Sequence, residues 1–224
     1  MTKKMVLPLF IISASIAFGA LTPVANAGEF TADCESGSSC QFTASGGAFS
    51  LVNDKGEGVS CNSVSGVPVI TSGSSTGFTG PLAFHACFEN ITGFKFSCSN
   101  AAEAGEIKTN SMALHHIYLE PNKSEPGIML TGANVTFTCA GFAKKTVTGD
   151  LIGRFTNPSC GTFQTFHTVV FDQVSTGVQR YTQVTTSGFG SDLITNNDAG
   201  GASTTSAMSG SLTFSHAPKV KYTC

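Results

Sequence analysis

Short stretches of alternating hydrophobic and polar residues follow one another along the chain from about residue 29 onward. In FKFSC at 94–98, the phenylalanines and the cysteine fall on one side of an extended chain, and the lysine and serine fall on the other. Segment 135–139 alternates in the same way. Such runs recur roughly every 8–12 residues between turn-forming residues, which is typical of β-strands. We expect little or no helix after the first 27 residues.

The pattern places turns as well as strands. Gly46-Gly47 is a hairpin signal, and the Gly- and Ser-rich stretch 188–206 predicts a long polar loop. We predict strands at 41–45, 48–52, 58–64, 67–71, 82–88, 94–98, 106–109, 112–120, 127–131, 134–139, 146–152, 162–172, 177–186, 208–215 and 220–222.

Many short strands with glycine-rich turns predict an all-β fold, either an antiparallel β-sandwich or a flattened β-barrel. A chain of this length buries roughly 70% of its unfolded surface, enough for one core. We therefore expect a single β domain at 28–224. Segment 105–141, with three strand-like runs, is expected to be its structural centre.

The first residues have a different pattern. Lys3 and Lys4 precede an almost wholly apolar run at 5–21, and ANA at 25–27 matches an A-x-A cleavage site. This predicts a secretory signal peptide, 1–27, that is cleaved from the mature chain. An uncleaved anchor is disfavoured because the run is near the lower limit of a spanning helix. We expect the protein to be secreted, extracellular or associated with the cell envelope, with no later membrane span.

All the cysteines lie in the predicted mature chain. An even number in an exported protein indicates disulfides, whereas the absence of C-x-x-C and of zinc-finger spacing disfavours metal. A local bridge between Cys34 and Cys40 fits the short Gly/Ser-rich interval, and a hairpin bridge between Cys87 and Cys98 fits a regular ladder. A bridge from Cys224 would fasten the chain end. The eight are Cys34, Cys40, Cys61, Cys87, Cys98, Cys139, Cys160 and Cys224.

Net charge gives no indication of a nucleic-acid or anionic-membrane partner. The formal charge is −2 for the whole chain and −2 − 2 = −4 once Lys3 and Lys4 are removed with the signal. Nucleic acid and anionic membranes favour a basic face, so this balance implies neither of them.

The pair His115-His116 is the first candidate for a chemical site. Neighbours on a strand point to opposite faces, so these two rings cannot chelate one metal from a regular strand. We expect one buried, hydrogen-bonded histidine and one at a rim. The alternative is a metal site with His85, His167 or His216 as a third ligand, and we assign none.

Ser75 lies in GSSTG at 73–77, a literal match to the G-x-S-x-G nucleophile motif. That motif requires a strand-to-helix turn, and here Pro81 and another strand follow. We therefore predict that Ser75 is not catalytic.

Four carboxylates near predicted strand ends are the candidates for an acid/base pair, but the sequence cannot place any two of them at a productive separation. We predict no catalytic, metal or cofactor-binding residue. The four are Glu89, Glu120, Asp150 and Asp172.

Several short segments of the chain form a recognisable set: GEIKT (105–109), PGIML (126–130), FTCAG (137–141) and VTGDLIG (147–153), with VSC (59–61) and LAF (82–84) upstream, and Cys87 and Cys98. In these segments the chain resembles a large set of secreted actinobacterial proteins of unknown function. The resemblance covers about two-thirds of the mature chain and implies an exported β-rich domain.

The same resemblance implies a set of disulfide pairs. Four cysteines belong to the shared pattern and four are additional. The favoured pairs, among 105 possible ones, are Cys61–Cys139, Cys87–Cys98, Cys34–Cys40 and Cys160–Cys224.

These observations favour an exported, non-catalytic β-domain that binds a protein partner or a surface at or outside the cell envelope. A carrier of small apolar ligands with a barrel lumen is the first alternative, and a secreted hydrolase is the second. Carbohydrate binding ranks lower because the chain has no Trp and 3 Tyr for aromatic platforms. No cofactor is predicted, and the oligomeric state is left open.

Overall fold

The computed structural model describes residues 28–91, 93–119, 125–158, 160–180, 193–197 and 204–224. The predicted signal peptide lies outside these ranges. The described part is all-β, as the alternating pattern predicted. Its strands are β1 Thr31–Cys34, β2 Ser39–Gly46, β3 Phe49–Asn53, β4 Gly58–Cys61, β5 Ser63–Gly66, β6 Pro68–Thr71, β7 Thr76–Thr79, β8 Ala83–His85, β9 Phe88–Ile91, β10 Phe94–Ser99, β11 Ile107–Lys108, β12 Met112–Tyr118, β13 Pro126–Cys139, β14 Ala143–Phe155, β15 Gln164–Phe171, β16 Gln173–Ser175, β17 Val178–Gln179, β18 Leu193–Asn197 and β19 Thr204–Thr223.

The antiparallel pairings close into two rings that share β13, β14 and β19. The first ring runs β3–β4–β9–β10–β13–β14–β18–β19 and returns to β3. The second runs β2–β6–β7–β12–β13–β14–β15–β19 and returns to β2. The fold is thus a flattened barrel, and closure pairs most of the strand edges that an open sheet would expose.

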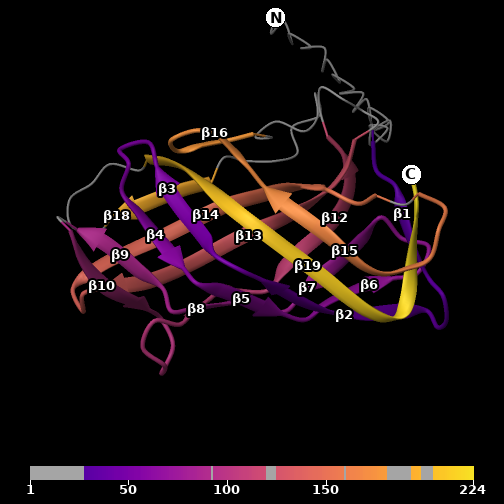
Figure 1. Cartoon of the computed structure of the whole chain (residues 1–224), viewed down its shortest axis with the longest axis horizontal. Helices are drawn as coiled ribbons and strands as arrows, with labels where there is room; N and C mark the ends of the chain where they lie inside the picture. Colours follow the sequence, from indigo (N-terminus) through magenta and orange to yellow (C-terminus); the bar gives the residue numbers. More distant parts are fainter. Residues whose placement is uncertain (1–27, 92, 120–124, 159, 181–192, 198–203) are drawn as a thin grey trace, which may run out of the picture.

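The three shared strands run along the molecule (Figure 1). The β9–β10 hairpin lies at one end, and β1 and the C terminus lie at the other (Figure 1). Between the two rings, β2 is followed by β5, β8 and β11, which pair in that order. In the part of the chain that the structure describes, β11 does not pair with β13, and no further strand joins the two directly.

Two segments predicted as separate strands form one continuous strand, because the chain bends between them and does not make a turn. Segments 127–131 and 134–139 form one strand, β13, whose register against β14 shifts between Leu130 and Ala133. Gly132, in this bulge, has a φ of 78° that a side chain would disfavour. The loop predicted at 188–206 is wrong in part, because β18 and the start of β19 fall inside it. Residues 181–186 of a predicted strand lie outside the described ranges.

One hydrophobic cluster extends from Phe30 to Tyr222 and so draws on almost the whole described chain. Aromatic rings fill the end near the C terminus, where Phe30 contacts Tyr222 edge-on with centroids 5.7 Å apart. Phe155 also packs on Tyr222, at 5.0 Å. In the described residues, no helix is long and apolar enough to cross a membrane.

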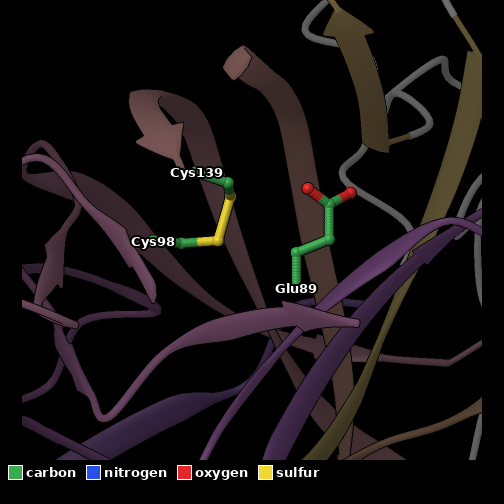
Figure 2. A group of neighbouring side chains, drawn as sticks. All are labelled: Glu89, Cys98 and Cys139. Atoms are coloured by element: carbon green, nitrogen blue, oxygen red, sulfur yellow. A yellow bond between two sulfur atoms is a disulfide. The ribbon is translucent and has the colours of Figure 1, made fainter. Parts of the chain in front are cut away.

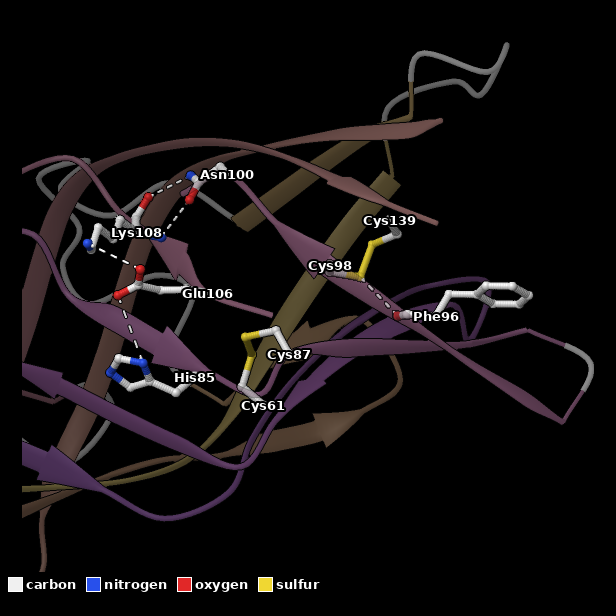
Figure 3. Close-up of a disulfide and its surroundings, with 9 residues drawn as sticks. All are labelled: Cys61, His85, Cys87, Phe96, Cys98, Asn100, Glu106, Lys108 and Cys139. Atoms are coloured by element: carbon white, nitrogen blue, oxygen red, sulfur yellow. Dashed lines mark hydrogen bonds and ion pairs between the residues drawn. A yellow bond between two sulfur atoms is a disulfide. The ribbon is translucent and has the colours of Figure 1, made fainter. Parts of the chain in front are cut away.

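Four disulfides are present, and two of the predicted pairs are wrong. The structure has the predicted Cys34–Cys40 and Cys160–Cys224 bridges. It pairs Cys61 with Cys87 and Cys98 with Cys139, in place of Cys61–Cys139 and Cys87–Cys98 (Figure 3).

Strand order explains the correction. Cys61, Cys98 and Cys139 lie on β4, β10 and β13, and Cys87 directly precedes β9. The four form one row, so Cys61 and Cys139 are about three strand spacings apart, roughly 14 Å. Cys87 and Cys98 are neighbours, but the Cys98 N–H donates to the Cys87 carbonyl at 3.0 Å. Hydrogen-bonded pairs hold their Cα atoms about 5.5 Å apart, farther than non-hydrogen-bonded ones. The Cα atoms of both observed bridges are 4.0 Å apart.

Candidate functional site

An apolar cavity of about 80 Å³ lies in the barrel, lined mostly by strands of the first ring together with residues of β8 and β11. Its walls come from opposite sides of the barrel, with Phe49 of β3 and Val59 of β4 on one side and Val135 of β13 on the other. Of the residues that line it, Ser50 and Thr109 are the ones with a side-chain hydroxyl. A space with so few polar groups holds water poorly, and an apolar cavity of about 150 Å³ is known to stay dry and bind benzene or xenon.

A buried ion pair lies beyond the cavity, toward the β9–β10 end. Glu89 of β9 and Lys145 of β14 are 5% and 7% exposed and are joined by a charge-assisted hydrogen bond from Nζ to Oε1. Lys145 lines a small space of about 10 Å³ with Leu51, Val59 and Phe137, which also line the cavity. The lumen is therefore apolar in its middle and charged next to this end.

Glu89 also lies beside the Cys98–Cys139 disulfide (Figure 2). One carboxylate oxygen and the two sulfur atoms lie within 4.8 Å of one another, which is compatible with a shared ligand. Metals bind the thiolate form of cysteine, and both sulfur atoms here are joined in the disulfide. We therefore assign no metal to this group.

The structure separates the two neighbouring histidines as the alternation predicted. His116 is 1% exposed, and its Nδ1 lies 3.2 Å from the Ser75 carbonyl oxygen. Burial lowers the pKa of His116 to about 4. His115 points the other way, partly exposed, with Nδ1 3.7 Å from Glu29 Oε1. The prediction of one buried and one rim histidine is confirmed.

Two further histidines are buried near His116. His167 Nδ1 and His216 Nε2 are 2.9 Å apart, so one ring donates a hydrogen bond to the other. Burial lowers the pKa of His216 to about 4. Burial, together with the neighbouring His216, lowers the pKa of His167 to about 3. These rings are neutral packing groups at neutral pH. His85 lies apart, near Glu106, with Nδ1 and Oε1 3.9 Å apart (Figure 3).

Ser75 has acidic and basic neighbours, but their order does not suit nucleophilic catalysis. Its hydroxyl donates to Glu29 Oε2 at 2.6 Å, and Glu29 lies between Ser75 and His115. A triad needs the histidine next to the hydroxyl so that the ring can take its proton. Ser75 precedes strand β7 instead of a helix, and Gly77 lies against the Val69 carbonyl of β6. Gly77 therefore serves close packing between β7 and β6, and the prediction that Ser75 is not catalytic stands as a prediction.

The four candidate carboxylates do not come together as an acid/base pair. Glu89 pairs with Lys145 inside the lumen. Asp150 Oδ1 accepts the Gly132 N–H at 2.9 Å, and Asp172 accepts from Arg154 Nε at 2.9 Å. Glu120 lies outside the described residues. The described three have structural partners of their own.

Comparison with known proteins identifies no relative. No protein-family model, curated protein or solved structure matches the chain. The resemblance to secreted actinobacterial proteins therefore stays a prediction.

Sequence reasoning missed the residues that define the cavity. Ala133, Val135 and Phe137 looked like ordinary core residues, because alternation shows which side chains point inward but not whether they fill the space between strands. Lys145 carried a signal in the sequence, because this charged residue stands at an inward position among apolar ones such as Phe137 and Val147 on the facing strands. For its partner Glu89, the only signal in the sequence was that this carboxylate lies near a predicted strand end.

Proposed function

We propose that this chain is an exported, non-catalytic binding domain that holds a small apolar ligand inside its barrel. The apolar cavity in the first ring carries this proposal. Natural interiors are close-packed, with few voids larger than a water molecule, so an apolar space of about 80 Å³ is unusual in a core. A ligand that fills it would gain the contacts that the lining side chains lack.

Two other features support a binding role in an oxidising compartment. The four disulfides are typical of exported proteins, and the Cys61–Cys87 and Cys98–Cys139 bridges fasten strands next to the cavity. Ser75 and the described carboxylates lack the geometry of a hydrolytic site, so a secreted hydrolase is the weaker alternative.

Displacement of an environment-sensitive fluorophore by decane or decanol would test the proposal, with Val135→Phe as the key variant. Val135 is 7% exposed and lines the cavity, so the larger ring should occupy the ligand's space and weaken binding at least tenfold. Val174→Phe is the control, because Val174 is 63% exposed and outside the cavity. Equal affinity of Val135→Phe and the unmodified chain, at equal thermal stability, would refute binding in this cavity.

Association with a surface is a second candidate, and it does not exclude the first. Two phenylalanines at hairpin turns of one barrel end, Phe94 and Phe142, are 69% and 81% exposed. Lys95 directly follows Phe94 in the sequence, and Lys144 lies two residues after Phe142. This combination favours contact with a lipid surface that carries anionic head groups.

A further inference from the structure

The wall of the barrel has a gap next to the cavity. Along the edge that faces away from β14, β13 pairs with β12 as far as Thr131 and with β10 from Thr138 onward. Across the described residues between these two points, no strand pairs with that side of β13. We call this open edge, between 107–110 on one side and 133–137 on the other, the seam.

The cavity reaches the seam from inside. Ile107 and Thr109 line the cavity from one edge of the seam, and Ala133, Val135 and Phe137 line it from the other. A path between these edges would therefore lead from the surface directly to the apolar space.

Side-chain contacts close the two ends of the seam. At one end, Asn110 Nδ2 donates to the Gly132 carbonyl and its Oδ1 accepts the Asn134 N–H, both at 2.8 Å. At the other end, the Cys98–Cys139 disulfide joins β10 to β13 covalently. The distance along β13 between Thr131 and Thr138 is roughly 20 Å.

The connection between β10 and β11 leads directly into the 107–110 edge of the seam and is well anchored. The Asn100 side chain forms two hydrogen bonds with the Lys108 main chain, at 2.8 and 2.7 Å, and closes the loop between them (Figure 3). Glu106, 7% exposed, pairs with Lys108 Nζ at 3.2 Å. This segment can hold one edge of the seam in place while the Asn110 contacts open and close.

We propose that the seam is the ligand entrance and that the ligand is a single-chain amphiphile. This inference rests on the proposed function. An opening bounded by two neighbouring chain segments suits a slender alkyl chain, whereas a rigid polycycle needs a wider one. The rim offers hydrogen-bonding groups at Asn110, Asn134 and Thr136, so a polar head group can stay outside while the chain enters the cavity.

Stopped-flow fluorescence with a naturally fluorescent polyene fatty acid, such as cis-parinaric acid, tests the entrance. Asn110→Ala removes the contacts to Gly132 and Asn134, and it should raise the association and dissociation rates together, each at least threefold, with little change in Kd. Asn157→Ala is the matched control. Asn157 also bridges two chain segments, accepting the Thr168 N–H at 2.8 Å, but it does not line the cavity.

Rates for Asn110→Ala that match those of Asn157→Ala would overturn the entrance while leaving cavity binding intact. A Kd that weakens without faster association would also overturn it, since Asn110 would then hold the ligand instead of admitting it.

A ligand series tests the chemical class. Decanol and dodecanoate should displace the polyene probe, whereas cholesterol, a rigid polycycle, should not. Displacement by cholesterol with equal affinity would refute the slender-chain assignment. If neither the probe nor any alkyl compound binds the unmodified chain, the proposed function itself fails.

Discussion

At the scale of single residues, the buried histidines make stability depend on pH. His116, His167 and His216 are almost inaccessible to solvent and have pKa values lowered to about 4, 3 and 4, chiefly by burial. An unfolded histidine titrates near 6.5. Between pH 6.5 and about 4, the unfolded chain therefore binds protons that the folded chain does not, and stability falls as pH falls through this window.

The expected size of this effect can be measured with one variant. For His116 alone, the free energy of unfolding should drop by roughly 2 kcal/mol between pH 7.5 and pH 5. Urea unfolding at both pH values should show a smaller drop for His116→Phe than for the unmodified chain. Phe155→Leu, a change in the same cluster that does not titrate, should keep the full drop. An unchanged pH dependence in His116→Phe would contradict the prediction.

The Glu89–Lys145 pair gives a second expectation at this scale. Glu89→Gln leaves the Lys145 ammonium buried without its counter-charge, so we expect a loss of roughly 3–5 kcal/mol in the free energy of unfolding. Glu89→Leu combined with Lys145→Met removes both charges and should restore most of that loss. Chemical unfolding of the three proteins decides this, and a double variant less stable than Glu89→Gln would count against the argument.

Individual residues were predictable to different degrees. The separation of His115 from His116 follows from strand geometry alone, because neighbouring side chains alternate between faces. The partners of Cys61 and Cys98 do not follow, because they depend on which strands are adjacent and on which positions of the ladder are hydrogen-bonded. Local alternation contains neither.

At the scale of elements, the bulge in β13 is the feature that ends the β12 ladder and begins the seam. Gly132 has a φ of 78°, and a Cβ there would meet no atom within 4 Å. An alanine would fit in space but would be forced into a left-handed backbone. We expect Gly132→Ala to lower the free energy of unfolding by about 1 kcal/mol.

A second glycine supplies the control for that measurement. A Cβ added at Gly47 would likewise meet no atom within 4 Å, and the φ of Gly47 is not in the left-handed region. Gly47→Ala should therefore leave thermal stability unchanged or raise it slightly. Equal destabilisation by both substitutions would show that the backbone of the bulge is not the cause.

The existence of most strands was predictable, and their arrangement was not. Segments 127–131 and 134–139 each show the two-residue period, but nothing in them states that a single glycine joins them into one strand. The cavity and the seam arise from the order in which strands pair around the barrel. That order is set by contacts between residues far apart in sequence, so a local pattern cannot reveal it.

At the scale of the whole molecule, export and oxidation can be tested together. Four disulfides remove 4 × 2 = 8 hydrogen atoms from the reduced chain. Intact-mass spectrometry of the exported protein should show the loss of residues 1–27 and a mass eight hydrogens below that of the reduced mature chain. Free thiols or a retained leader would refute the proposed maturation.

The end of the barrel that carries the β9–β10 hairpin is the surface most suited to a lipid membrane. The β10–β13 register continues one step beyond the Cys98–Cys139 pair, with the Ala140 N–H donating to the Ser97 carbonyl at 3.1 Å. The turns that carry Phe94 and Phe142 therefore lie at the same end (Figure 1). Together these rings expose roughly 300 Å², well below the ~800 Å² per partner of a stable protein interface.

Two separate rings on projecting turns can each enter a bilayer interface, because that medium adapts its shape to them. Removing both in Phe94→Ser/Phe142→Ser should lower binding to vesicles of phosphatidylcholine with about 30% phosphatidylglycerol at least tenfold, since burying one phenylalanine contributes roughly 1.5–3 kcal/mol. Phe166→Ser is the control, because Phe166 is 52% exposed but lies on β15, away from these turns. Flotation assays that show equal binding of all three proteins would rule out this end as the lipid contact. Binding lost only in the double variant would place the lipid contact at the end of the barrel that carries the β9–β10 hairpin, in the half of the molecule that also contains the cavity.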